Sequence, residues 1–189
     1  MFSICYKNIP KIVNRHLEWS NLIPPEGKPP MFDLIAWAVA TVMAIISIIV
    51  HYETMSLVSD RLVPWGLRHG QGRRTIVLSL LALMLGHIIE IWLFALALFT
   101  LGFLPDFGGF GGNIDGGVTD YLYFSAVNYT SLGYGDIYPL GSLRAVAVTE
   151  TLTGLTMIAW SASFTYLKME QIWQSRAEQK HNKPLSNKD

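Results

Sequence analysis

The chain has 189 residues and no formal net charge, and its composition is 51% hydrophobic but only 15% charged. An average soluble domain has about 25% charged residues, so this composition argues against an ordinary soluble domain. The single cysteine, Cys5, excludes an intrachain disulfide and a cysteine-rich metal framework. The zero net charge gives no reason to expect a nucleic acid as a partner.

Residues 1–31 read as a lead-in, with a candidate interfacial helix around Ile9 to Ile23. The basic residues of this segment are followed by Glu18 and by prolines, not by a short apolar core. The segment therefore lacks the layout of a signal peptide. Two pairs of prolines separate it from the apolar part of the chain.

Three apolar blocks follow: Phe32 to Val50, Thr75 to Leu101 and Leu143 to Leu167. Each has about the 20 residues that a helix needs to cross the apolar core of a bilayer. Buried helices of a soluble protein are the alternative, but three such blocks leave too little polar surface to cover them. We therefore predict three transmembrane helices, the first of which packs peripherally against the second.

The charged residues predict an orientation for these helices. The loop 53–74 and the tail 168–189 contain most of the lysines and arginines, whereas residues 102–141 contain none and carry four aspartates. The positive-inside rule places the basic loop and the tail in the cytoplasm and the acidic stretch outside. Three spans then put the N-terminus outside, although three basic residues of the lead-in argue against that placement.

The acidic stretch has two parts. Residues 102–118 are rich in glycine and predict a flexible exposed loop. Residues 119–130 predict a short helix, with Thr119 or Asp120 as its N-cap. This helix is too short to span a membrane, so we expect a re-entrant element. Non-helical backbone at membrane depth is tolerated only where protein or water satisfies its polar groups.

The heptapeptide TSLGYGD, from Thr130 to Asp136, follows the short helix directly. Gly133 and Gly135 can adopt backbone angles that are closed to other residues. Successive carbonyl groups can therefore be turned to one side of the strand. Several chains that each offer such a row would form rings of oxygen atoms, and these rings can replace the water around an alkali cation.

This heptapeptide resembles the selectivity filter of the potassium-channel pore-domain superfamily, whose usual form is Thr-Thr-Val-Gly-Tyr-Gly-Asp. The resemblance extends from about Tyr121 to Leu167, and the order of short helix, filter and long helix also matches. The chain is similar to small bacterial members that carry an extra N-terminal span. The resemblance implies an all-α membrane protein with three transmembrane helices, a re-entrant pore helix and a selectivity-filter loop.

The implied organisation is a peripheral helix (32–52) followed by a pore module (75–167). The module consists of an outer helix (75–101), an extracellular loop (102–118), a pore helix (119–130), the filter (131–136) and an inner helix (142–167). By the same resemblance, the K⁺ ligands are the carbonyl groups of Ser131, Leu132, Gly133 and Tyr134, and the Ser131 hydroxyl closes the innermost site. Filter support is implied for Thr130, Gly135, Asp136 and Tyr123, whose hydroxyl can bond Asp136.

Three positions depart from the family pattern. Ser131 replaces a threonine and lacks its methyl group, so the innermost site is expected to be looser. Leu132 replaces a valine, and its larger side chain must fit behind the filter. Val127 stands where some bacterial relatives have a glutamate that braces the filter.

Two acids lie inside the apolar blocks. Glu90 is roughly 16 Å and Glu150 roughly 12 Å below the outer ends of their helices, at about 1.5 Å per residue. Both are expected behind the pore helix, near each other or near Ser125 and Asn128. Our hypothesis is that Glu90 or Glu150 replaces the missing brace and makes gating sensitive to pH. The alternative is a structural carboxyl group that holds two helices together.

Two further positions carry open alternatives. His87 lies one turn before Glu90, on the same face of the helix, and the two side chains would be a weak metal pair without other ligands. Gly154 is either the hinge of the inner helix, as in the family, or a site of close packing against a neighbouring helix.

The sequence thus predicts a homotetrameric potassium channel that conducts passively, with K⁺ as the permeant ion and no cofactor. It is expected to be an integral membrane protein in contact with lipid, in a bacterial inner membrane by the resemblance, with no nucleic acid or soluble substrate as a partner. No nucleophile–base pair or phosphate loop points to an enzyme. The alternatives are a weakly selective monovalent cation channel and a non-conducting membrane sensor or subunit.

Overall fold

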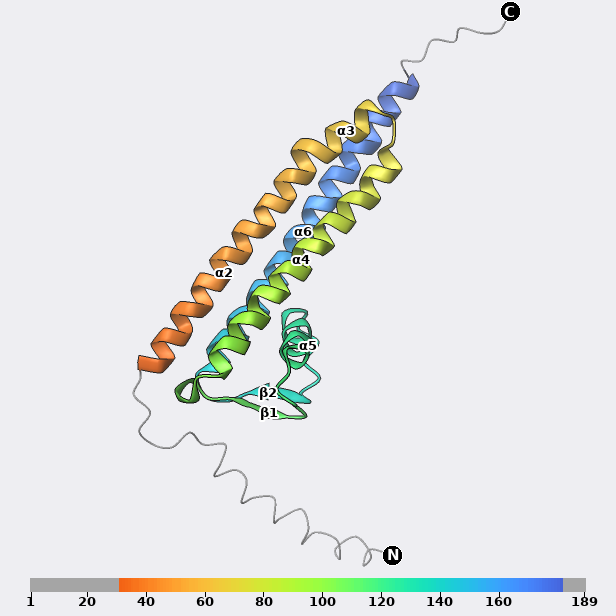
Figure 1. Ribbon diagram of the computed structural model, residues 1–189. Helices are drawn as coiled ribbons and strands as arrows, with labels where there is room; N and C mark the ends of the chain where they lie inside the picture. The colour runs from red at the N-terminus through yellow and green to blue at the C-terminus, as the bar shows by residue number, and fades with distance from the viewer. Residues whose placement is uncertain (1–30, 182–189) are drawn as a thin grey trace, which may run out of the picture.

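The computed structural model describes residues 31–181. The predicted interfacial helix around Ile9 to Ile23 lies outside the described residues, as does the end of the predicted tail after His181. Three long helices run side by side, namely α2 (Met31–Leu57), α4 (Gly72–Gly102) and α6 (Leu143–His181) (Figure 1).

Among the described residues, two helical segments have the length and apolar composition to cross a membrane, Met31–Arg68 and Gly72–Gly102, with mean hydropathy of 2.4 and 2.2. The third predicted span, in α6, is not one of the two. Its sequence between Leu143 and Leu167 includes Glu150 and several threonines, which lower the apolar character of the helix.

The first helix packs against both of the others, and not only against α4 as the sequence led us to expect. Its buried positions are mainly small or polar residues on one face, Ala36, Ala40, Ser47, His51 and Met55. Small residues allow helices in a membrane to approach closely. The Ser142 hydroxyl, directly before α6, donates a hydrogen bond of 2.6 Å to the Asp33 carboxylate in the first turn of α2. The first helix is therefore an integral part of the helical bundle.

The predicted loop 53–74 is mostly helical, which corrects the prediction. Helix α2 passes into a π-helical turn, η2 (Val58–Leu62), and then into α3 (Val63–Arg68) before a short turn leads to α4. Pro64 lies in the first turn of α3, directly after the π-helical turn, and the chain stays helical through it. The charged residues of this segment lie on exposed helical positions and do not end the helix.

The inner helix is also longer than predicted, since α6 continues from Leu167 to His181. Residues 168–181 contain no glycine or proline and consist largely of good helix formers. Ile172 is buried in a small cluster with Val58 and Val63, so the extension packs against η2 and α3. This tertiary contact stabilises a segment that the sequence described only as a polar tail.

The glycine-rich loop 102–118 is more ordered than predicted. It forms a short 3₁₀ helix, η3 (Pro105–Phe107), and the strand β1 (Phe110–Gly112), which pairs antiparallel with β2 (Ile137–Pro139). Two aromatic residues fix the loop: the Phe107 ring lies 5.4 Å from that of Phe32, and the Phe110 ring lies 5.1 Å from that of Phe124.

Helix α5 (Val118–Tyr129) packs against α4 and α6 at the end of the bundle that also holds the two strands (Figure 1). The largest core cluster lies at this end and includes Phe94 and Leu98 of α4, Phe124 of α5 and Val146 of α6. The chain leaves the last turn of α5, passes through residues 130–136 and enters β2. The candidate filter is therefore held at one end by a helix and at the other by the strand pair.

Candidate functional site

The backbone of the candidate filter is fixed where it leaves α5. Thr130 is the C-cap of α5, and its hydroxyl donates a hydrogen bond of 2.7 Å to the Ala126 carbonyl group. The amides of Ser131 and Leu132 donate hydrogen bonds of 2.9 Å to the carbonyl groups of Asn128 and Val127. The negative end of the α5 dipole thus lies at the start of this segment, which favours a nearby cation.

The backbone angles of the segment alternate in handedness. Ser131, Gly133 and Gly135 have φ of 57°, 58° and 75°, whereas Leu132 and Tyr134 between them do not have positive φ. In a regular strand, successive peptide groups face opposite sides. Alternation between left-handed and right-handed angles reverses every second peptide group, so that successive carbonyl groups can face one side. The sequence anticipated this geometry for the two glycines.

Ser131 is the only residue other than glycine with positive φ among residues 31–181. An L-residue with a side chain adopts this region rarely, at a cost of order 1–3 kcal/mol that the surrounding structure must offset. Strained backbone of this kind is concentrated at functional sites. The sequence pointed to Ser131 for its hydroxyl group and held no signal for its backbone strain.

The side chains of the segment are exposed in the single chain. Leu132 is 57% and Tyr134 66% exposed, although both are largely apolar. A hollow of about 490 Å³ lies between this segment, α5 and α6, and its lining includes Tyr123, Val127 and Val148. Burying such side chains is worth about 1.5–3 kcal/mol each. The chain therefore offers an apolar surface around its filter that another protein surface can cover.

The predicted hydrogen bond between Tyr123 and Asp136 is present. The Tyr123 hydroxyl of α5 donates to a carboxylate oxygen of Asp136 at 2.9 Å. This hydrogen bond raises the pKa of the Tyr123 hydroxyl above its ordinary value. The phenol therefore stays protonated at neutral pH and remains a donor, and it ties the end of the candidate filter to the middle of α5.

Glu150 lies behind α5, as the sequence predicted. It is fully buried and accepts hydrogen bonds from the Ser125 hydroxyl and from the Asn128 amide, the latter at 2.8 Å. The Ser125 hydroxyl also lies 2.8 Å from the Ile91 carbonyl group of α4. Glu150 thus joins α6 to two turns of α5.

Glu90 was also expected near Ser125 and Asn128, but it does not contact either residue. Its carboxylate contacts His51 at 2.8 Å and accepts a hydrogen bond from the Tyr129 hydroxyl. In the described part of the chain, the hydrogen bonds of both acids go to residues outside 131–136. The predicted brace is therefore indirect: the acids hold the pore-helix segment α5 and not the filter backbone.

Gly154 lies against the end of α5. A Cβ atom on this residue would lie 2.1 Å from the carbonyl oxygen of Tyr129, far inside van der Waals contact. Of the two roles, the structure supports close packing, and Gly154 lies within the continuous helix α6.

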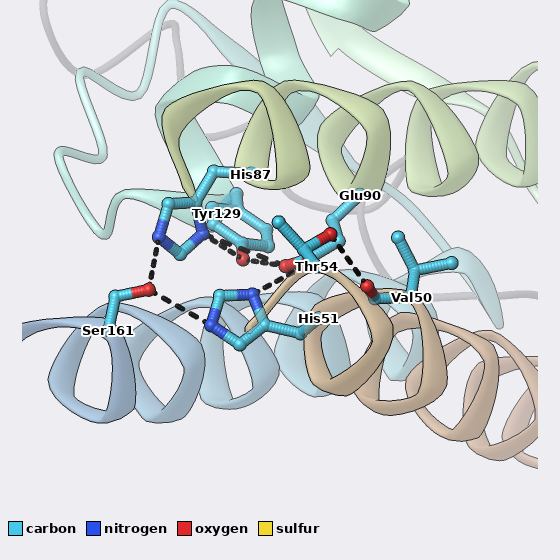
Figure 2. A network of polar contacts seen from close by, with 7 residues as sticks. All are labelled: Val50, His51, Thr54, His87, Glu90, Tyr129 and Ser161. Carbon is cyan, nitrogen blue, oxygen red and sulfur yellow. Dashed lines mark hydrogen bonds and ion pairs between the residues drawn. The ribbon is translucent and has the colours of Figure 1, made fainter. Parts of the chain in front are cut away.

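Three residues that sequence reasoning missed join His87 and Glu90 in a buried network, shown in Figure 2: His51, Tyr129 and Ser161. We call this set the histidine network. Its members come from four helices that are far apart in the sequence. The available signal was His51, which directly follows the apolar residues Ile48 to Val50. An ionisable residue inside a membrane span usually has a polar partner.

Comparison with known proteins agrees with this geometry. Residues 86–171, just under half of the chain, match the family model described as "Ion channel". No curated protein and no solved structure shows a significant match. The matched segment runs from the middle of α4 through α5 and the candidate filter into α6. Over this segment the chain is similar to the ion-channel family, in agreement with the pore-domain resemblance of residues 130–136.

Proposed function

We propose that the chain is the subunit of a potassium-selective channel and that it conducts K⁺ passively through a pore shared by several copies. The carbonyl groups of Ser131, Leu132, Gly133 and Tyr134 are the proposed ligands. The alternation of backbone handedness at Ser131, Gly133 and Gly135 carries the proposal, because it allows a continuous row of carbonyl oxygens. Rows of this kind can replace the hydration shell of K⁺.

The proposed assembly is a homotetramer. One strand cannot surround an ion, and each chain contributes one strand, so the ligand rings require several copies around an axis. The exposure of Leu132 and Tyr134 and the adjacent hollow support this assembly, because neighbouring copies would cover these apolar surfaces.

The proposed orientation puts the α3 end of the bundle in the cytoplasm. Arg61, Arg68, Arg73 and Arg74 gather at this end, whereas Asp106, Asp115, Asp120 and Asp136 lie in or near the strand pair at the other end (Figure 1). We include α6 as a third span, since its 39 residues extend over about 58 Å at 1.5 Å per residue. Its polar residues then face water or other protein groups inside the assembly.

A weakly selective cation channel is the second candidate. The observation that favours it is Ser131, which combines a small side chain with strained backbone at the innermost site. If this site is loose, Na⁺ is rejected less well.

The reversal potential of the purified protein in planar bilayers, with K⁺ on one side and Na⁺ on the other, distinguishes these candidates. We expect reversal near the K⁺ equilibrium potential. Reversal near zero with clear currents would favour the weakly selective channel. Absence of flux from well-assembled protein would favour a non-conducting subunit.

Two glycine variants control this measurement. Gly133→Ala places a side chain at a φ of 58° and is expected to abolish the current. Gly109→Ala lies outside the filter, has ordinary φ and meets no atom within 4 Å, so it should conduct like the wild type.

A further inference from the structure

The histidine network is buried in the middle of the helical bundle. His51 belongs to α2, His87 and Glu90 to α4, Tyr129 to the last position of α5 and Ser161 to α6. The side chains of His51 and Glu90 are completely buried, and that of His87 is 19% exposed. Figure 2 shows the two imidazole rings and the carboxylate converging on one point between the helices.

Five close polar contacts hold the network together. Glu90 contacts His51 Nδ1 at 2.8 Å and the Tyr129 hydroxyl. The Ser161 hydroxyl lies 2.9 Å from His51 Nε2 and 3.1 Å from His87 Nε2. The fifth contact joins His87 Nδ1 and the Tyr129 hydroxyl at 3.0 Å.

The number of protons does not match the number of contacts. Each hydrogen bond needs one proton, so the five contacts need five. With Glu90 ionised and both histidines neutral, the network contains four: one on each imidazole, one on the Tyr129 hydroxyl and one on the Ser161 hydroxyl. In this protonation state one contact lacks a proton, and one additional cation, either a fifth proton or a metal ion, would complete the network.

The geometry suits a metal ion. When both Nε2 atoms donate to Ser161, both Nδ1 atoms present lone pairs toward Glu90. Histidines that bind metals usually donate their other ring N–H to an outer acceptor in this way. One ligand atom from each of His51, His87 and Glu90 lies within 4.8 Å of the others. Zinc binds nitrogen and oxygen at about 2.0–2.2 Å, so an adjustment of about 1 Å closes the set.

We propose that His51, His87 and Glu90 bind one divalent transition-metal cation of the Zn²⁺ class, with the Tyr129 hydroxyl beside the ion. Two imidazoles and one carboxylate are a ligand set for Zn²⁺, Co²⁺ or Ni²⁺, whereas Ca²⁺ and Mg²⁺ prefer oxygen ligands. The proposed site is distinct from the filter, and binding of the metal does not depend on ion conduction.

The proposed site is reached from a groove between α4 and α6. A groove of about 270 Å³ is lined by His87 and Ser161, and its other lining residues are Leu80, Leu83, Met84, Ala162 and Thr165. The exposed part of His87 is therefore the first ligand that an ion meets, and the buried His51 and Glu90 complete the site.

A metal ion bound at this site would affect the candidate filter through Tyr129. The ion would tie α2 to α4 and replace the proton-mediated contacts around Tyr129, which directly precedes Thr130. Its presence is therefore expected to change the position or the stability of the end of α5.

The test is a Co²⁺ titration of the full chain in detergent, with any purification tag removed and the protein treated with a chelator. We expect one equivalent of Co²⁺ per chain, with the visible absorption of a site of low coordination number, and displacement by Zn²⁺. His51→Asn and His87→Asn should abolish this absorption. Asparagine places an amide near the position of Nδ1, so it can keep a hydrogen bond while losing the metal ligand.

Two further variants make the titration specific. His69→Asn removes an exposed histidine outside the network and should bind Co²⁺ like the wild type. Ser161→Ala removes only the outer partner of the two imidazoles and should weaken binding about 10- to 100-fold. The melting temperature of each variant without metal shows whether it is folded, and folded wild-type chain should melt at a higher temperature with Zn²⁺.

The proposal is overturned if folded wild-type chain takes up neither Co²⁺ nor Zn²⁺, in which case a proton completes the network. Binding that persists in both His51→Asn and His87→Asn also overturns it. These results are independent of the reversal potential, since a chain that binds the metal without conducting would refute only the channel.

Discussion

The carbonyl oxygen of Tyr129 lies against Gly154, so that a Cβ atom on Gly154 would be 2.1 Å away from it. Tyr129 ends α5, directly before the candidate filter, and Gly154 lies inside α6. The last turn of the pore-helix segment is thus in backbone contact with the long helix behind it.

Gly154→Ala is predicted to destabilise the protein by about 1–3 kcal/mol, because the added methyl group forces apart two backbones. The matched control is Gly86→Ala, at which a Cβ atom would approach only the Thr54 side chain, at 3.3 Å. Alanine is the better helix former, so this control should melt at a similar or higher temperature than the wild type. Equal melting temperatures of the two variants would contradict the packing role of Gly154.

Substitution of Glu150 by glutamine or by alanine separates the role of its hydrogen bonds from the role of its ionisable carboxyl group. Glu150→Gln can accept from Asn128 and donate to Ser125, whose hydroxyl can then donate to the Ile91 carbonyl group. We expect this variant to assemble and to conduct. Glu150→Ala leaves the α5 donors without this partner and should lower stability by about 1–3 kcal/mol.

Conductance of Glu150→Gln across pH then tests the pH hypothesis for this acid. A pH response that is unchanged from the wild type would assign Glu150 a structural role. Loss of the response, with stability preserved, would assign it a role in gating.

Tyr123→Phe is predicted to weaken the filter without unfolding the chain. The variant loses the hydrogen bond that the Tyr123 hydroxyl donates to the Asp136 carboxylate. We expect currents that decline faster during recording, with an unchanged melting temperature of the helical bundle. Currents as stable as those of the wild type would show that the bond does not support the filter.

The contribution of Tyr123 should not vary near neutral pH. Its pKa is raised in the folded chain from the ordinary value of 10.0, so the stabilisation is present below about pH 10 and is lost as the pH rises further. The difference between Tyr123→Phe and the wild type is therefore expected to be constant from mildly acidic to mildly alkaline solution, as measured by the decline of the current.

Ser131 is predicted to act through its hydroxyl group at the innermost ion site. Ser131→Ala should lower the K⁺/Na⁺ permeability ratio by up to about tenfold, the equivalent of about 1.4 kcal/mol. Ser131→Thr keeps the hydroxyl and should keep the selectivity. The reversal potentials of the wild type, Ser131→Ala and Ser131→Thr test this role of the hydroxyl group. Identical values for Ser131→Ala and the wild type would exclude the hydroxyl as a ligand.

Local sequence was sufficient for the parts of the site that lie within one short segment. The handedness at Gly133 and Gly135 and the contact of Tyr123 with Asp136 depend on residues no more than 13 positions apart. The first follows from the backbone angles that glycine can adopt, and the second from the length of one helix. The apolar blocks likewise predicted the long helices, because a membrane requires about 20 apolar residues in a row.

The remaining features depend on contacts across the bundle. His51 and Ser161 are separated by 110 positions, and nothing near either residue indicates the other. Helix continues through the predicted loop and tail because Ile172 packs with Val58 and Val63, a contact between distant segments. In the glycine-rich loop, Phe107 and Phe110 fix the structure by packing against the core. The glycines of the loop had predicted only conformational flexibility.

Burial of Glu90 by the first helix limits the modularity of this protein. His51 covers one oxygen of that carboxylate, and both side chains have no exposed surface. A pore unit cut away from α2 would turn a carboxylate toward hydrocarbon at a cost of several kcal/mol. Removal of the first helix is therefore expected to destabilise α4 and α5, so that α2 and the segment that follows it should be retained together.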